Sequence, residues 1–257
     1  MIPAKFSSHH NEPTIQTTTT QKEPHSVITL RKSNDRGHAD HGWLQSFHTF
    51  SFASYYDPSH IHFRQLRVFN EDIIAGGGGF PTHGHDNMEI ITVVISGILE
   101  HKDSMGNTAQ IRPGEVQVMS AGSGITHSES NPSTTEPIHL FQIWIFPKTQ
   151  DTPPSYRQKD FSSASKTNEW TRYVSPDGID GSLSIDQDAF LYGISLTEGT
   201  ATQHPLTEKR HGFIHVISGM IVANGQMMSA GDAAFVTGEP LNITALEHSH
   251  LLLFDLG

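Results

Sequence analysis

Hydrophobic and polar positions alternate in short runs along most of this chain, which is the pattern of β-strands. From residue 27 onward, apolar or alternating runs are separated by Gly, Pro, Asn and Asp. No stretch keeps the i, i+3, i+4, i+7 spacing of an amphipathic helix over three turns. The pattern therefore predicts an all-β fold of the β-sandwich or jelly-roll barrel type. The clearest strand candidates are 90–95, 116–119, 140–146, 213–217 and 251–254.

Two halves of the sequence resemble each other. The string Val-Ile-Ser-Gly at 94–97 recurs at 216–219, and each copy is followed by a Gly-acidic turn, at 113–115 and at 230–232. Between the halves, residues 151–170 are rich in Pro, Ser and charge and predict a linker. We therefore expect two tandem domains of one β-fold, at 27–150 and 171–257.

The first 26 residues predict a disordered tail. They contain four consecutive Thr residues and no apolar run that could act as a signal-peptide core. Later apolar runs fall far short of the roughly 18 residues that a membrane span needs. These features predict a soluble, cytoplasmic protein without a membrane partner.

Composition restricts the chemistry. With 16 Lys and Arg against 27 Asp and Glu, the formal net charge is −11. Such a field repels nucleic-acid backbones, so we expect no direct nucleic-acid partner. The chain has no Cys, which excludes disulfides, thiolate zinc sites, iron–sulfur clusters and Cys nucleophiles. Any metal must be held by carboxylates and by some of the 18 His residues.

Two i, i+2 pairs in the first half are candidate ligands. They are His83 with His85 and His127 with Glu129. Alternate side chains of a strand share one face, so two neighbouring strands can present all four groups to one interior. Three imidazoles and one carboxylate suit a first-row divalent transition metal better than calcium or magnesium.

Chance also produces such pairs. The His content alone predicts about 1.3 His-x-His pairs, and the sequence contains three. We interpret the pairs at 60 and 62 and at 248 and 250 as ordinary surface or core histidines. The context of His83 and His85 is different, because Gly77 precedes them and Glu89 and Gly97 follow at regular offsets.

These strings resemble a known family. The patterns Gly77-x5-His83-x-His85-x3-Glu89-x7-Gly97 and Gly124-x2-His127-x3-Asn131 are similar to the two signature motifs of the cupin superfamily. The chain from about 30 to 161 resembles the pirin family more specifically. The strings that carry this likeness are 36–44, 48–52, 55–58, 87–90, 103–107, 119–122 and 124–129.

The resemblance implies a bicupin whose N-terminal domain holds one metal ion through His83, His85, His127 and Glu129. Iron is the first expectation, and Ni, Cu, Mn, Zn or Co also fit. Gly84 stands where relatives often have Pro. In the second half, the same offsets from its own glycines fall on Pro205, Thr207, Thr244 and Leu246, so we expect no metal there.

The resemblance also implies quercetin 2,3-dioxygenase activity, in which a flavonol ring is opened with O2 and CO is released. Glu129 is then the expected catalytic base, and Glu89 the group that orients a ligand imidazole. We expect the aromatic stretch over 43–56 to pack core and lid, and His48 to be satisfied locally. Two alternatives remain open: a non-enzymatic, metal- or redox-dependent regulator with protein partners, and an oxygenase or isomerase for another small molecule.

Overall fold

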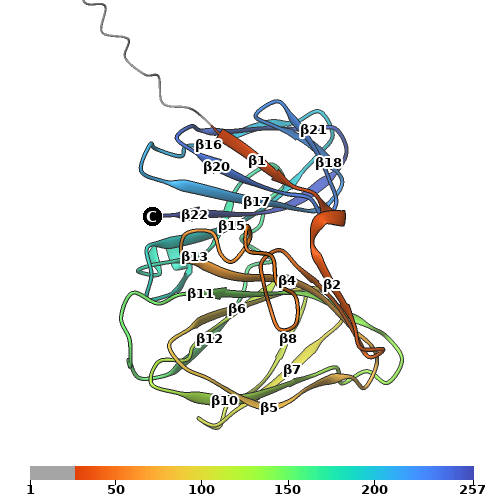
Figure 1. The fold of residues 1–257 in the computed structure, drawn as a ribbon, viewed down its shortest axis with the longest axis vertical. Coiled ribbons are helices and arrows are strands. Elements are labelled where there is room, and N and C mark those ends of the chain that lie inside the picture. Colours follow the sequence, from red (N-terminus) through yellow and green to blue (C-terminus); the bar gives the residue numbers. More distant parts are fainter. Residues whose placement is uncertain (1–26) are drawn as a thin grey trace, which may run out of the picture.

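Two β-sandwiches lie one above the other (Figure 1). The computed structural model describes residues 27–257, so the tail predicted at 1–26 lies outside the described residues. Each sandwich pairs a seven-stranded sheet with a four-stranded sheet. The predicted all-β bicupin fold is confirmed, in the form of sandwiches. The two 3-10 helices, Ser33–Asp35 and Ile179–Gly181, have three residues each. Within the described chain, no helix has the length and apolar character that a membrane crossing requires.

The lower sandwich in Figure 1 is built from the first half of the chain. Its large sheet runs, in spatial order, β12 (Ser155–Asp160), β9 (Glu115–Ser120), β6 (Glu89–Ser96), β11 (Ile138–Ile145), β4 (Leu66–Ile74), β3 (Leu44–His48) and β2 (Gly37–Asp40). Its small sheet runs β5 (Gly79–His85), β10 (Ile125–Ser130), β7 (Leu99–Asp103) and β8 (Thr108–Ile111).

The upper sandwich repeats this arrangement. Its large sheet runs β1 (Val27–Arg31), β20 (Ala233–Thr237), β17 (His211–Ser218), β22 (Ser249–Leu256), β15 (Ala189–Leu196), β13 (Thr171–Ser175) and β14 (Leu183–Ser184). Its small sheet runs β16 (Ala201–His204), β21 (Leu241–Ala245), β18 (Met220–Ala223) and β19 (Gln226–Ser229).

The repeated Val-Ile-Ser-Gly string ends equivalent strands in the two sandwiches. It closes β6 in one and β17 in the other, and both strands are third in their large sheets. The glycines that follow, Gly97 and Gly219, have φ of 79° and 86°. This left-handed backbone is strained for other residues, which explains why both copies of the turn use Gly.

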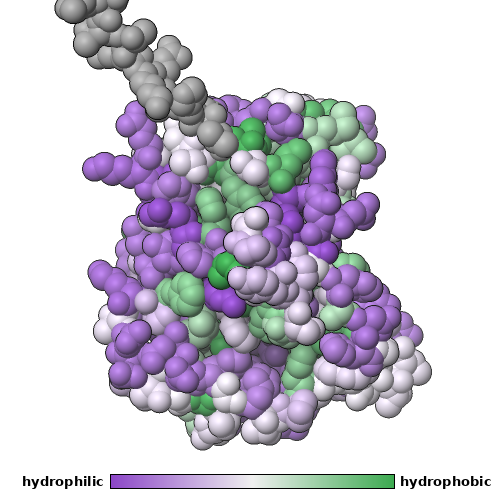
Figure 2. Space-filling model, viewed as in Figure 1, coloured by the Kyte–Doolittle hydropathy of each residue, from purple (hydrophilic) through white to green (hydrophobic). Residues whose placement is uncertain are grey.

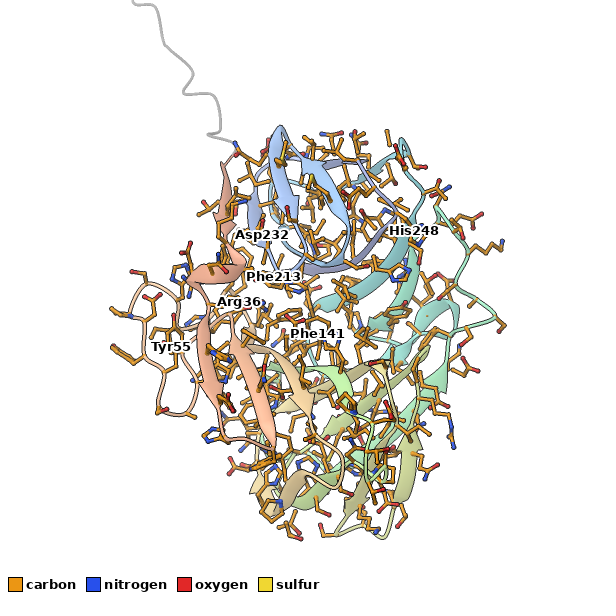
Figure 3. The ribbon with its side chains drawn as sticks, turned by 90° about the vertical axis from the view of Figure 1, so that its right-hand side faces the viewer. Arg36, Tyr55, Phe141, Phe213, Asp232 and His248 are labelled. Atoms are coloured by element: carbon orange, nitrogen blue, oxygen red, sulfur yellow. The ribbon has the colours of Figure 1, made fainter. Side chains whose placement is uncertain are left out.

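The two large sheets pack face to face through aromatic side chains. Phe69 of β4 lies 5.0 Å from Phe213 of β17 and 5.1 Å from Phe141 of β11, measured between ring centroids. Figure 3 shows Phe141 and Phe213 at the junction of the two sandwiches. All three rings are fully buried. The face in Figure 2 is mostly hydrophilic or neutral, with hydrophobic residues in short strips.

Sheet membership differs from the predicted domain boundaries at two strands. β1 was placed in the first domain, but it pairs with β20 of the upper sandwich. β12 lies inside the predicted linker, but it pairs with β9 of the lower sandwich. Each strand covers an edge whose backbone groups would otherwise lack partners. An edge strand needs little apolar surface, so β12 can form within a segment rich in Pro, Ser and charge. The composition of 151–170 therefore gave no sign of this strand.

Candidate metal centre

The four predicted ligands lie on adjacent strands of the lower small sheet. His83 and His85 are on β5, and His127 and Glu129 are on β10. His83 and His127 are direct cross-strand partners, and a bulge between His127 and Glu129 shifts the register so that Glu129 faces Phe80. The extra residue lies on β5, because β10 keeps a regular register with β7, so His127 and Glu129 stay on one face of β10.

Three imidazoles converge. The Nε2 atoms of His85 and His127 are 2.9 Å apart, and the ring of His83 lies 4.4 Å from that of His127. Each ring offers one nitrogen as a ligand atom, and these three nitrogen atoms lie within 4.8 Å of one another. Metal–nitrogen bonds are about 2.0–2.1 Å long, so this separation fits three ligands around one ion.

Two of the imidazoles, those of His85 and His127, are suited to bind as neutral ligands. Burial and the nearby His83 and His85 together lower the pKa of His127 to about 3. Burial and the neighbouring His83 likewise lower the pKa of His85 to about 4. Neutral imidazoles carry the free lone pair that coordination requires. The donor set therefore fits a divalent transition metal.

Glu129 belongs to an overlapping group. Its carboxylate lies within 4.8 Å of ligand atoms of His127 and His101, and this group shares His127 with the group formed by His83, His85 and His127. Both oxygens accept hydrogen bonds from Nε2 of Gln142, at 2.8 and 2.7 Å. Burial raises the pKa of Glu129 to about 7, against the hydrogen bond from Gln142. The carboxyl group can therefore take up or release a proton near neutral pH.

His101 and Asp103 of β7 also lie beside the imidazoles, although neither was among the predicted site residues. Nδ1 of His101 lies 3.5 Å from Nδ1 of His127, and its Nε2 lies 3.2 Å from Oδ2 of Asp103. Both side chains are fully buried. Metal-bound imidazoles usually have such a partner on the second ring nitrogen. The i, i+2 spacing of His101 and Asp103 was the available signal, since it resembles that of the ligand pairs.

Glu89 lies apart from the imidazoles. Its carboxylate accepts a hydrogen bond of 2.8 Å from Ser120, and no imidazole among residues 27–257 donates to it. Along β6, Glu89 shares a face with Ile91 and Val93, which pack in the core between the sandwiches. Ile90, on the other face, packs inside the lower sandwich. The period of two therefore turns Glu89 away from the predicted role.

A cavity of about 610 Å³ opens beside the imidazoles. Several aromatic side chains line it, among them Trp43, Phe52, Phe80 and Trp144. The stretch over 43–56 was expected to pack core and lid. Phe50 does lie in the core, but Trp43 and Phe52 face the cavity. A cavity lined by aromatic rings together with a few polar side chains, such as Glu129 and Gln142, has the composition of a small-molecule site.

The upper small sheet replaces the ligands with apolar residues. By register, His127 and Glu129 correspond to Leu241 and Ile243. Glu129 pairs with His101, four residues after Gly97, and Ile243 pairs with Ala223, four residues after Gly219. Both are buried in an apolar cluster. The equivalent of His83 is His204, which pairs with Leu241 as His83 pairs with His127. The positions counted from the glycines were therefore wrong by one to three residues, because the intervening loops differ in length.

His204 keeps an imidazole in the upper sandwich but uses it elsewhere. Its Nε2 lies 3.2 Å from Oδ2 of Asp255. That carboxylate also accepts a hydrogen bond from Arg210 at 2.6 Å. In the upper sandwich, His204 is therefore engaged by Asp255, and the residues around Ile243 form an apolar core. These side chains stabilise the fold.

Comparison with known proteins gives two family matches. Residues 29–145 match the family described as "Pirin", and residues 173–256 match "Quercetinase C-terminal cupin domain". A protein of Escherichia coli K12 named "Quercetin 2,3-dioxygenase" is 47% identical over 231 residues, covering 90% of this chain and 99% of its own. A "Pirin-like protein" of Caulobacter vibrioides is 43% identical over 230 residues, covering 88% of this chain and 98% of its own.

Solved structures agree. The bacterial pirin YhhW from Escherichia coli, in complex with nickel(II), superposes with a TM-score of 0.86 at 46% identity, covering 90% of this chain and 99% of that chain. A second structure of YhhW gives a TM-score of 0.87. The likeness spans both sandwiches.

Proposed function

This chain belongs to the pirin family, and from that premise we propose that it is a metal-dependent quercetin 2,3-dioxygenase. The observation that carries the proposal is the convergence of three imidazoles and the Glu129 carboxyl group at one cavity. Relatives that share almost their full length with it bear that name. The substrates are then a flavonol and O2, and the products include CO.

We assign the metal to His83, His85, His127 and Glu129, with one ion per chain. The related bacterial pirin whose structure is in complex with nickel(II) supports a divalent transition metal as the cofactor of this chain. When bound, such an ion polarises substrate oxygens and brings reactants together. The apolar residues of the upper sandwich at the equivalent positions support a single site.

The side chains around the imidazoles orient the metal ligands and accept the substrate proton. Asp103 accepts from His101, which in turn lies against His127, and this sequence of contacts fixes the tautomer and ring angle of His127. Glu129 accepts the proton of the flavonol 3-hydroxyl. Gln142 holds the carboxylate in position through two hydrogen bonds.

The aromatic residues bind the body of the substrate. Phe52 and Trp144 meet edge to face with ring centroids 5.3 Å apart, and so do Trp43 and Phe80 at 5.2 Å. Such surfaces bind a flat aromatic ligand and exclude water from the reacting atoms.

The expected partners and cellular location form part of the same proposal. The negative net charge disfavours direct binding to nucleic acids or anionic membranes, and a cytoplasmic location suits a diffusible flavonol substrate. The regulator with protein partners stays a prediction from the resemblance alone.

Aerobic incubation with quercetin tests the proposed activity. The metal-loaded protein should consume quercetin and release CO, and chelation followed by dialysis should abolish both. Restoring a divalent metal should restore both signals. A loaded protein that leaves quercetin intact would show that the cavity serves another substrate or a regulatory role.

A further inference from the structure

A second polar group lines the same cavity, away from the predicted metal ligands. It consists of Ser46 and His48 on β3 and Asn70 and Asp72 on β4. Ser46 pairs with Asp72 across the sheet and His48 pairs with Asn70. All four residues are 3–4% exposed. Polar side chains are rarely buried together on one wall of a cavity unless something there uses them.

Hydrogen bonds fix the arrangement of three of these side chains. The Ser46 hydroxyl donates to Oδ1 of Asp72 and lies 2.8 Å from Nε2 of His48. A hydroxyl has one proton, so His48 must donate to the Ser46 oxygen. Ser46 and His48 therefore hold the Asp72 carboxylate in one orientation.

Asn70 and Asp72 keep unused hydrogen-bonding capacity. Oδ2 of Asp72 and the side-chain amide of Asn70 have no hydrogen-bond partner within residues 27–257, and Oδ1 of Asn70 is buried as well as unpaired. Buried polar atoms without partners are unfavourable unless a ligand or water satisfies them. A ligand in this cavity that carries a hydroxyl group would supply the missing partner.

A row of aromatic contacts connects this polar group with the imidazoles. Ring centroids are 5.2 Å apart for His48 and Phe52, 5.3 Å for Phe52 and Trp144, and 4.9 Å for Trp144 and His85. A flat ligand lying along this row can reach His85 with one end and the polar group with the other. The cavity therefore fits a planar molecule with oxygen atoms at both ends.

We propose that Asn70 and Asp72, held by Ser46 and His48, bind a phenolic hydroxyl on the substrate ring that lies remote from the metal ligands. This inference rests on the proposed function and specifies its substrate class as ring-hydroxylated flavonols. Asn70 and Asp72 contact the hydroxyl. Ser46 and His48 are positioning residues, which act through Asp72.

The test compares quercetin with 3-hydroxyflavone, which keeps the 3-hydroxyl and the carbonyl but lacks the other ring hydroxyls. In metal-loaded Asn70→Ala and Ser46→Ala variants, the KM for quercetin should rise about tenfold relative to the KM for 3-hydroxyflavone, as expected for one lost hydrogen bond. Ser54→Ala is the matched control, because Ser54 lines the same cavity with an exposed side chain. Its ratio of KM values should equal that of the wild type.

Equal changes in the two KM values, or none, would overturn the subsite. Quenching of tryptophan fluorescence provides a second measurement, since Trp43 and Trp144 line the cavity. If the wild type binds both flavonols but turns over neither, the proposed activity fails, while the ratio of the two Kd values in the variants still decides the subsite. If the wild type binds neither flavonol, both proposals fail.

Discussion

His85 and His127 face each other across strands β5 and β10 with their Nε2 atoms 2.9 Å apart. Burial holds the pKa of each ring well below neutrality. Two neutral nitrogens at this distance repel unless a proton or a cation lies between them. A metal ion satisfies both, and the third imidazole, His83, completes the group.

Metal binding should therefore stabilise the fold. A divalent transition metal at 100 times its Kd should add about 2.7 kcal/mol to the free energy of unfolding of the wild type. His127→Ala should lose this gain, whereas His248→Ala, at an exposed His-x-His pair, should retain it. Thermal melts with and without metal measure the effect, and elemental analysis should give one ion per chain. A Tm gain that survives in His127→Ala would place the ion elsewhere.

Glu129→Gln should separate metal binding from turnover. The amide keeps the size of the side chain but cannot accept a proton as a base. We expect most of the metal to remain and the rate of quercetin consumption to fall by about 100-fold or more. Elemental analysis and oxygen uptake on the same sample provide the two readings. Turnover at the wild-type rate would remove Glu129 from the proposed role.

The variants His101→Gln and Glu89→Gln test which residue orients a metal-binding imidazole. The structure favours His101, whereas the sequence predicted Glu89. His101 lies against His127, so its replacement should weaken metal affinity roughly 10- to 100-fold. Glu89 accepts a hydrogen bond from Ser120 of the neighbouring strand β9 and has no imidazole partner among the described residues, so its replacement should leave affinity unchanged. Competition with a chromogenic chelator measures both. The reverse result would restore Glu89 as the orienting group.

Acid stability should depend on Glu71 at the junction of the sandwiches. Burial alone would raise its pKa, but hydrogen bonds from His139 and Arg36 and the charge of Arg36 lower it from 4.5 to about 2. Arg36, labelled beside the junction in Figure 3, lies 2.7 Å from the carboxylate. A depressed pKa stabilises the folded state above pH 4.5, and this contribution is lost as the pH falls toward 2.

Glu71→Gln should therefore reduce the free energy of unfolding by about 3 kcal/mol at pH 7 and flatten its decline between pH 4.5 and 2. Urea titrations at several pH values test both statements. Glu247→Gln, at an exposed glutamate, is the control and should follow the wild-type curve. If the free energy of unfolding of Glu71→Gln fell with pH as steeply as that of the wild type, other carboxylates would be responsible for the loss of stability in acid.

The local pattern was sufficient for the strands and for which of the predicted ligands share a face. A period of two placed His83 with His85, and His127 with Glu129, on shared faces, and the repeated Val-Ile-Ser-Gly string predicted two equivalent domains. These features depend on residues close together in the sequence, where backbone geometry alone decides which side chains share a face.

Only the tertiary structure decided which strands are neighbours. It joined β1 to the upper sandwich and β12 to the lower one, and it turned Glu89 away from the imidazoles. It also brought His101 against His127 and placed Asp72 in the same cavity. Strand pairing depends on backbone hydrogen bonds and burial between segments far apart in the sequence. Alternation within one strand specifies its faces but carries no information about the strand beside it.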